Sequence, residues 1–389
     1  MKRPVAKLEC LACGYADYRM SAKVIGDLAP GECPKCGGDM AVVAKELPPK
    51  LYEVEDLVSK HFEVTDFHLT EGSMEFEVST PDTKSSFVGL LHDLKPKGYM
   101  AALRERGGEL KLLVAVSPRI KEGNVIINIL LIFATIASTF LAGYYIIFDE
   151  NALYAGMFSA TIMLILGAHE LGHKIAAWRH DVAATMPYFI PAPTGLGTLG
   201  AFIKIKSPIP TKEALVEMGA SGPIFGFLVA LPITIVGLGL SQPLSQPDPE
   251  GTSLFITPLL FAILQLLTFG QIPAGLKLNP LAFAGWVVMV VTMFNLMPVG
   301  QLDGGHVARG LLDAERHYRL SRMLSLALIL IGFINPVFSV FLIWGFLTFI
   351  LFRGYHMGAL DDVSELSRRH KLLAVAAFVI FLLCFPLPF

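Results

Sequence analysis

The sequence predicts a polytopic α-helical membrane protein, with six to seven spans and a short membrane-associated β element, behind a soluble N-terminal part. Only 16% of its 389 residues are charged, against about 25% in soluble domains, and the mean hydropathy is +0.58. Apolar runs long enough to cross a bilayer begin after position 123, whereas two Cys-x-x-Cys pairs lie near the N-terminus. We therefore expect three parts: a zinc ribbon over 1–46, a small α+β domain over 47–118 and a membrane domain over 124–389.

The N-terminal ribbon is predicted from cysteine spacing. The pairs Cys10–Cys13 and Cys33–Cys36 flank 19 residues, and four thiolates so arranged suit one tetrahedral structural zinc ion. Cys384 stands alone in the last apolar run, so the cysteine usage fits metal binding better than a disulfide framework. The flanks carry no basic cluster or aromatic platform and the net charge is −2, so no nucleic-acid partner is expected.

Residues 47–118 have the alternation of a small α+β domain. Its histidines are isolated, which is typical of surface or core positions, and it offers no catalytic constellation. The expected order is helix, hairpin, helix, hairpin, with helices at 53–61 and 87–94 and strands at 63–69, 73–79, 99–104 and 109–116.

Charge placement orients the membrane domain. The region before residue 124 holds 17 of the 31 Lys and Arg residues and should stay cytosolic. If 253–269 crossed the membrane, Asp303 would lie on the opposite side from His173, so we expect this segment to be re-entrant or interfacial. The predicted spans are 125–148, 152–176, 218–240, 281–299, 321–334, 336–352 and 372–388.

The most informative stretch is GAHELGHKIAAW, Gly167–Trp178, which ends an apolar run. Positions i and i+4 share one helix face, so His169 and His173 can bind one metal ion with Glu170 beside them. This is the arrangement of zinc hydrolases. The alternative is a polar patch that packs helices together, but ionisable groups within a membrane segment are expensive and usually functional.

A second constellation, NLMPVGQLDGG, follows at Asn295–Gly305. Its proline and glycines cannot sustain a helix, and unwound backbone at membrane depth must line protein or water. Asp303 can supply a third zinc ligand there, or it can act as the N-cap of the next helix. His306 and His180 are rival ligands. Asn295 can donate a hydrogen bond to a substrate or oxyanion, or satisfy the broken backbone.

The prolines of 187–193 forbid a helix in that stretch. Residues 197–205, which follow it, are typical of a strand or strand pair near the inner interface. An exposed edge here could accept an extended peptide through main-chain hydrogen bonds; the alternative is a loop that plugs the cavity. Glycines at 219, 222 and 226 are expected to allow close helix packing. The candidate substrate-binding residues are Gly197, Thr198, Leu199, Gly200, Ala201 and Phe202.

These paired motifs, HELGH and NLMPVGQLDGG, resemble the site-2 protease family of intramembrane zinc metalloproteases over roughly residues 125–389. Residues 197–202 and 222–226 look most like the branch with the plant plastid ethylene-dependent gravitropism-deficient and yellow-green proteases and their prokaryotic relatives. The resemblance implies that His169, His173 and Asp303 hold catalytic zinc and that Glu170 is the general base. It says little about residues 1–123.

The expected function is hydrolysis of peptide bonds in or near transmembrane segments of membrane proteins, as in regulated intramembrane proteolysis. The alternative is a catalytically inactive relative that binds membrane segments as a chaperone. Expected cofactors are two zinc ions, one catalytic and one structural. Expected partners are the lipid bilayer and membrane-protein substrates. We expect a multi-pass protein of a prokaryotic cell membrane, with a cytosolic N-terminus and the site toward the cytosolic side.

Overall fold

The chain divides into two compact units: residues 1–119 with 360–365, and residues 120–359 with 366–389. Each is described by itself. The computed structural model describes residues 5–20, 28–44, 49–70, 73–118, 123–193, 195–244, 256–273, 275–334 and 338–386.

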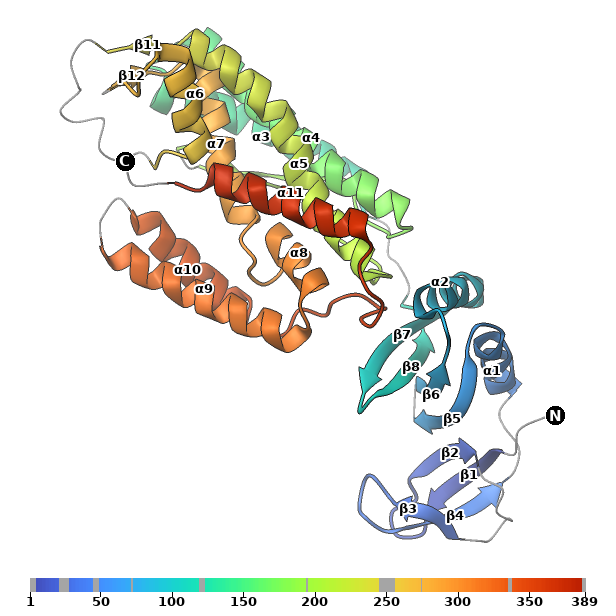
Figure 1. The fold of residues 1–389 in the computed structure, drawn as a ribbon. Coiled ribbons are helices and arrows are strands. Elements are labelled where there is room, and N and C mark those ends of the chain that lie inside the picture. The colour runs from blue at the N-terminus through green and yellow to red at the C-terminus, as the bar shows by residue number, and fades with distance from the viewer. Residues whose placement is uncertain are drawn as a thin grey trace. The chain divides into compact units, whose positions relative to one another are not determined.

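The first unit is built on an eight-stranded sheet in the order β3-β4-β1-β2-β5-β6-β8-β7, with antiparallel neighbours (Figure 1). The register Tyr18↔Leu69 joins β2 to β5, so the strands of the expected ribbon and of the expected α+β domain belong to one sheet. The strands are β1 Val5–Cys10, β2 Ala16–Met20, β3 Leu28–Glu32, β4 Asp39–Ala44, β5 Glu63–Thr70, β6 Ser73–Ser79, β7 Tyr99–Arg106 and β8 Glu109–Val116.

Helices α1 Pro49–His61 and α2 Thr83–Leu94 contribute to the core of this unit. Phe67 and Phe76 from the sheet and Phe87 from α2 are fully buried in it. Helix α2 begins four residues before the predicted start, because the Asp82 carboxylate accepts a hydrogen bond from the Ser85 N–H and caps the helix.

The outer edge of β7 is covered by residues 360–365, which come from the connection between the last two helices. Leu103 N–H donates to the Leu360 carbonyl at 2.8 Å, Asp362 N–H donates to the Leu103 carbonyl at 3.3 Å, and Leu103 forms a parallel bridge with Asp361. The Asp361 carboxylate accepts N–H groups from Val363 and Ser364, which folds the segment into a turn. The Leu103 backbone groups at this edge are thereby satisfied.

The second unit is helical. Its described helices are α3 Val125–Ala142, which continues as a π-helical turn over Gly143–Ile147, α4 Ala152–Arg179, α5 Lys212–Gly239, α6 Leu259–Phe269, α7 Pro280–Asn295, α8 Asp303–Leu311, α9 Ala314–Ile334, α10 Ser339–Leu351 and α11 Arg368–Cys384. Two short antiparallel pairs accompany them, β9 Tyr188–Pro191 with β10 Thr198–Phe202, and β11 Gln242–Pro243 with β12 Leu276–Lys277.

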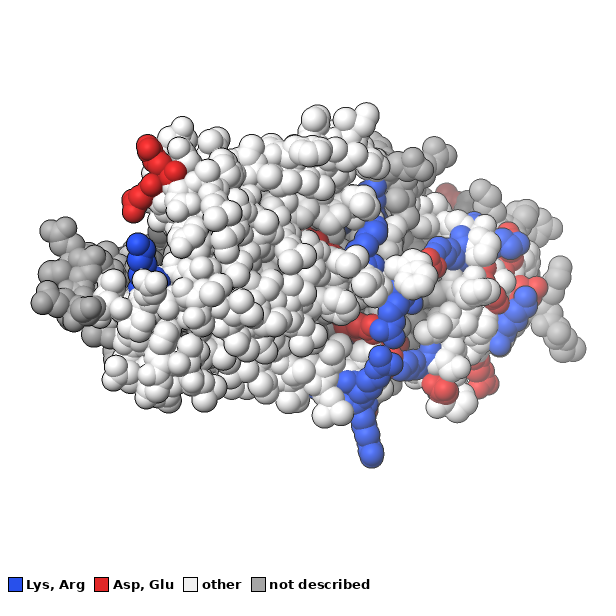
Figure 2. All heavy atoms as spheres, turned by 90° about the horizontal axis from the view of Figure 1, so that it is seen from above, with Lys and Arg blue, Asp and Glu red and all other residues white. Residues whose placement is uncertain are grey.

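Four of these helices are long and apolar enough to cross a membrane: 125–147, 152–179, 212–239 and 314–334. The surface over this unit has a broad area without Lys, Arg, Asp or Glu among the described residues on the face drawn in Figure 2. These features fit an integral membrane protein. Helix α6 has only 11 residues, which agrees with the expectation that it does not span, and 253–255 of that predicted segment lie outside the described residues.

Helix α9 corrects one predicted boundary. The apolar run at 321–334 is short for a span, but the helix starts at Ala314 and has 21 residues. Its first turns are charged, and Glu315 pairs with Arg319 one turn later on an exposed face. Hydropathy alone could not find this extension, because most of its residues are charged or polar and its inner face packs through the buried ring of His317 against His356 rather than through an apolar run.

Candidate metal centre

Helix α4 brings His169, Glu170 and His173 into a buried position. The two histidine Nε2 atoms face each other at 3.0 Å across one turn of the helix. Gly172 lets the backbone of α5 approach α4 closely at this point, because a Cβ atom there would lie 2.6 Å from the Ser221 carbonyl oxygen. The second helix then covers the face that carries the imidazoles.

Asp303 reaches the same point from the break after α7. The chain folds back tightly between Asn295 and α8, and a Cβ on Gly304 would lie 1.9 Å from the Leu296 carbonyl oxygen. Asp303 Oδ2 lies 3.2 Å from His169 Nε2, and its Oδ1 lies 3.4 Å from His173 Nε2. The alternative role as an N-cap is wrong, since Asp303 is the first residue of α8 and its carboxylate faces the histidines.

These three side chains fit a zinc ion. The Nδ1–H of His173 donates to the Met218 carbonyl at 2.7 Å, which leaves the lone pair on Nε2. When zinc is held by nitrogen or oxygen at about 2.0 Å, tetrahedral geometry separates the ligand atoms by about 3.3 Å. The two Nε2 atoms are 3.0 Å apart, and each lies 3.2 or 3.4 Å from one of the two Asp303 carboxylate oxygens. Asp303 Oδ2 and Glu170 Oε2 are buried without a hydrogen-bond partner among the described residues, as expected of atoms that await a metal or water.

A cavity of about 210 Å³ opens beside these residues. Asn295, the last residue of α7, lines it, as do Ala201 and Phe202 from β10 and the adjacent Ile203. Glu170 lines the same cavity. The carboxylate, the candidate amide donor and the strand therefore face one space.

The predicted peptide-binding stretch is a strand beside this cavity. In β10, Ala201 pairs with Phe189 of β9, and in the described part of the chain β10 has no strand on its other side. The Thr198 hydroxyl donates to the Ile190 carbonyl and accepts the Gly200 N–H, which pins an irregularity in the pairing. Gly197 precedes the strand with φ +75°, and Leu199 points outward and is exposed.

The two rival histidines have different positions. His306 lines the same cavity, three residues after Asp303 on α8. Its Nδ1 lies 2.6 Å from His356 Nε2, and His356 Nδ1 accepts the Gly358 N–H. Burial lowers the pKa of His356 to about 3, so it is neutral, with its proton on Nε2 for donation to His306. His306 therefore presents Nε2–H rather than a ligand lone pair. His180 lies past the end of α4 and contacts Glu217 instead.

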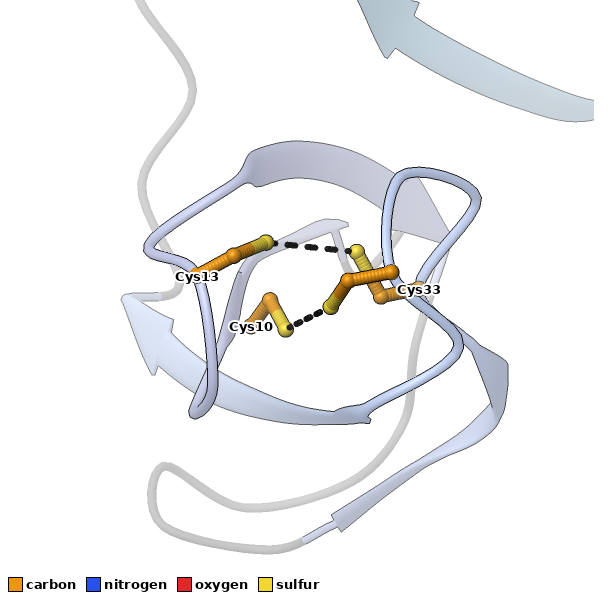
Figure 3. A group of neighbouring side chains, drawn as sticks. Cys10, Cys13 and Cys33 are labelled. Carbon is orange, nitrogen blue, oxygen red and sulfur yellow. Dashed lines mark hydrogen bonds between the residues drawn. The ribbon is translucent and has the colours of Figure 1, made fainter.

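The four N-terminal cysteines form a second cluster (Figure 3). Cys10 and Cys36 sulfurs are 3.5 Å apart, and those of Cys13 and Cys33 are 3.7 Å apart. Zinc–sulfur bonds of about 2.3 Å require about 3.8 Å between tetrahedral thiolates. In both knuckles the N–H two residues after the first cysteine donates to its sulfur at 3.4 Å.

The environment of Cys10 favours thiolate formation. Burial opposes ionisation, but hydrogen bonds from the Cys13 and Ala12 backbone outweigh it and lower the pKa of the Cys10 thiol to about 7. Gly14 and Gly37 close the two turns at φ +69° and +76°, a region that glycine enters without strain. The residues present fit one structural zinc ion.

Comparison with known proteins finds a peptidase family and several zinc metalloproteases. The family description "Peptidase family M50" matches residues 157–339. The chain is 32% identical over 252 residues to "Probable zinc metalloprotease EGY1, chloroplastic" of Oryza sativa subsp. japonica, covering 62% of this chain and 42% of the relative. It is 33% identical over 233 residues to the Arabidopsis thaliana protein of the same description, covering 57% and 41%.

A third relative, "Probable zinc metalloprotease EGY2, chloroplastic" of Arabidopsis thaliana, is 28% identical over 237 residues and is covered to 41%. The chain thus spans about two fifths of the length of these relatives. They are described as chloroplastic, so they give no support to the prokaryotic membrane expected from the sequence. No solved structure matches the chain. The expected resemblance is confirmed as a resemblance: residues 157–339 match the model of peptidase family M50, the site-2 protease family, and the relatives that the chain resembles are described as zinc metalloproteases.

Proposed function

We propose that this protein is an intramembrane zinc metalloprotease that hydrolyses peptide bonds in or near transmembrane segments of other membrane proteins. The observation that carries the proposal is the position of Glu170. Its carboxylate is buried, has an oxygen atom without a partner among the described residues, and lies beside three metal-type ligands and a polar cavity.

The residues around the cavity have distinct roles in the proposed hydrolysis. Zinc held by His169, His173 and Asp303 would polarise a substrate carbonyl and acidify a water molecule at its open position. Glu170 removes the proton of the attacking water and returns it to the leaving amine nitrogen. Asn295 and His306 Nε2–H line the same cavity and supply hydrogen-bond donors for the carbonyl oxygen as it gains charge.

The strand β10 suggests that the substrate binds by strand addition. A transmembrane helix satisfies its own backbone, so its amide bonds become accessible only when it unwinds. The unwound segment loses hydrogen bonds that the unpaired edge of β10 can replace by strand addition. Ala201 and Phe202 of β10 border the cavity, so a peptide added along this strand would run past Glu170.

The proposed topology follows from charge and the site. We propose six to seven spans, a cytosolic N-terminus and a metal centre toward the cytosolic side, because His169 lies in the half of α4 nearer its Arg179 end. Two zinc ions are proposed for these two sites, one catalytic and one held by the four cysteines.

The test uses Glu170→Gln in the full chain. The probes are synthetic peptides with an apolar core of about 20 residues, reconstituted with the protein in phosphatidylcholine vesicles, and products are read by mass spectrometry. Loss of the base should lower cleavage by at least about 10²-fold with zinc content unchanged. Glu315→Gln, which removes an exposed carboxylate from α9, is the matched control and should cleave as the wild type does.

Cleavage by the Glu170→Gln variant at the wild-type rate would refute the assignment. If the wild type binds the same peptides and holds its zinc but releases no products, the chaperone-like alternative is favoured instead. That alternative also predicts that Glu170→Gln leaves peptide binding unchanged.

A further inference from the structure

A third group of metal-type ligands lies in the helical unit, and none of its three residues lines the cavity. It consists of His180, Glu217 and His370, whose candidate ligand atoms all lie within 4.8 Å of one another. They come from three separate helices: His180 is the C-cap of α4, Glu217 lies in the second turn of α5, and His370 lies in the first turn of α11. All three are partly or largely buried.

The ligand atoms have the spacing of a coordination sphere. Glu217 Oε2 lies 3.0 Å from His180 Nε2 and 3.4 Å from His370 Nε2. The corresponding separations at the His169 centre are 3.0 to 3.4 Å, and both match the edge of about 3.3 Å that tetrahedral zinc requires. One oxygen and two Nε2 atoms thus converge, and a fourth position is left for water.

The surrounding side chains orient these ligands. His370 Nδ1 lies 2.8 Å from the Ser367 hydroxyl and 3.5 Å from Glu213 Oε1, so a proton on Nδ1 has acceptors there and would leave the Nε2 lone pair for a metal ion. A carboxylate behind a histidine is the arrangement that tunes metal-bound imidazoles. Arg179 Nη1 donates to Glu217 Oε1 at 2.5 Å, which fixes the carboxylate and turns Oε2 toward the histidines.

The charges also favour a cation. Glu213 and Glu217 bring two negative charges to this cluster, and Arg179 supplies one positive charge when both histidines are neutral. One negative charge in a largely buried place remains to be balanced. A divalent cation would balance this charge while bound to the ligand atoms of His180, Glu217 and His370, which already face one another. Protonation of a histidine is the competing solution, and it makes a metal-free ion-pair network.

We propose that His180, Glu217 and His370 bind a zinc ion through Nε2, Oε2 and Nε2, as a structural site that joins α11 to the ends of α4 and α5. Two imidazoles with one carboxylate form a ligand set that divalent transition metals accept. The site is separate from the proposed catalytic centre and would clamp the helix that carries His169 and His173. It does not depend on the proposed protease activity.

The test is zinc stoichiometry on the full chain in detergent, after saturation with Zn²⁺ and removal of excess by gel filtration. The wild type should hold three zinc ions per chain, one for each of the three clusters. His180→Ala with His370→Ala should hold two, and Glu217→Gln, which keeps the side-chain shape, should also hold two. The matched control, His68→Ala with His92→Ala, removes two histidines of the other unit and should keep three.

The outcomes separate this site from the catalytic one. His169→Ala with His173→Ala should also lose one zinc ion, independently of the variants above. The proposal would be overturned if the wild type saturates at two zinc ions and only the His169 and cysteine variants lose one. This result does not require the His180 variant to fold. Three ions in both the Glu217→Gln and the His180/His370 variants would overturn it equally.

Discussion

Gly222 on α5 determines whether His173 can occupy its place. A Cβ atom built on Gly222 would lie 2.1 Å from His173 Nε2, and 2.4 and 2.5 Å from the neighbouring ring carbons. Glycine is therefore needed here for space, not for backbone conformation. The change Gly222→Ala adds one methyl group against the ligand atom itself.

The size of the displacement follows from these distances. A carbon–nitrogen contact settles at about 3.5 Å, so the imidazole must move by about 1.4 Å, whereas metal ligands tolerate deviations of about 0.2 Å. The hydrogen bond of His173 Nδ1 to the Met218 carbonyl, now 2.7 Å, opposes such a movement. Overpacking costs about 1–3 kcal/mol, and the gain in helix propensity offsets about 1 kcal/mol of it. The fold should therefore survive while the metal site does not.

The assay compares zinc content, peptide cleavage and thermal unfolding for three proteins. Gly222→Ala should hold one zinc ion fewer than the wild type and lose cleavage by at least about 10²-fold, with a small change in Tm. Gly226→Ala places its Cβ at 3.2 Å from His169 Cβ and should have a weaker effect. Gly167→Ala on α4 meets nothing within 4 Å and should behave as the wild type. Wild-type zinc content and cleavage in Gly222→Ala would refute the packing argument.

Three further predictions concern the ribbon and the strand. Cys10→Ser should remove one zinc ion. It should also make the N-terminal unit more sensitive to added protease, because the ribbon has a small core that depends on the metal. Cleavage of the synthetic peptides should persist in the same sample. The pKa of Cys10 is lowered to about 7 and that of Cys36 is raised to about 12, so zinc must displace a proton from the cluster at neutral pH and the zinc affinity of the ribbon should fall as the pH drops; a chelator titration at pH 8 and pH 6 with no difference would contradict this. Thr198→Ala should loosen β10 and raise KM for peptides several-fold without changing zinc content; an unchanged KM would argue for the cavity-plug alternative.

Local spacing accounts for what the sequence could predict of the two expected sites. His169 and His173 lie one turn apart on a single helix, and each cysteine pair lies within one tight turn, so neighbouring positions fix both geometries. Asp303 is far from them in sequence. A carboxylate at a helix break within an apolar region suits either a zinc ligand or an N-cap, so the ligand role of Asp303 rested on the resemblance to the site-2 protease family.

The remaining features depend on long-range packing. His180, Glu217 and His370 meet only when the ends of three helices assemble, and their spacing along the chain contains no motif. The contact of Gly222 with His173 was expected only as general helix packing, since nothing local distinguishes it from Gly226. His306 had a usable signal, because it follows Asp303 by three residues on the same helix face.

The segment 360–365 that covers the edge of β7 affects how the N-terminal unit can be isolated. This unit is discontinuous in sequence, so a fragment that ends at residue 119 lacks its last strand-like segment. In β7 the Leu103 N–H and carbonyl would lose their partners, and the bare strand edge invites self-association. Binding measured on such a fragment would then reflect the strand edge exposed by the truncation rather than a property of the intact protein. A fusion that supplies residues 360–365 after a flexible linker should restore a monodisperse sample.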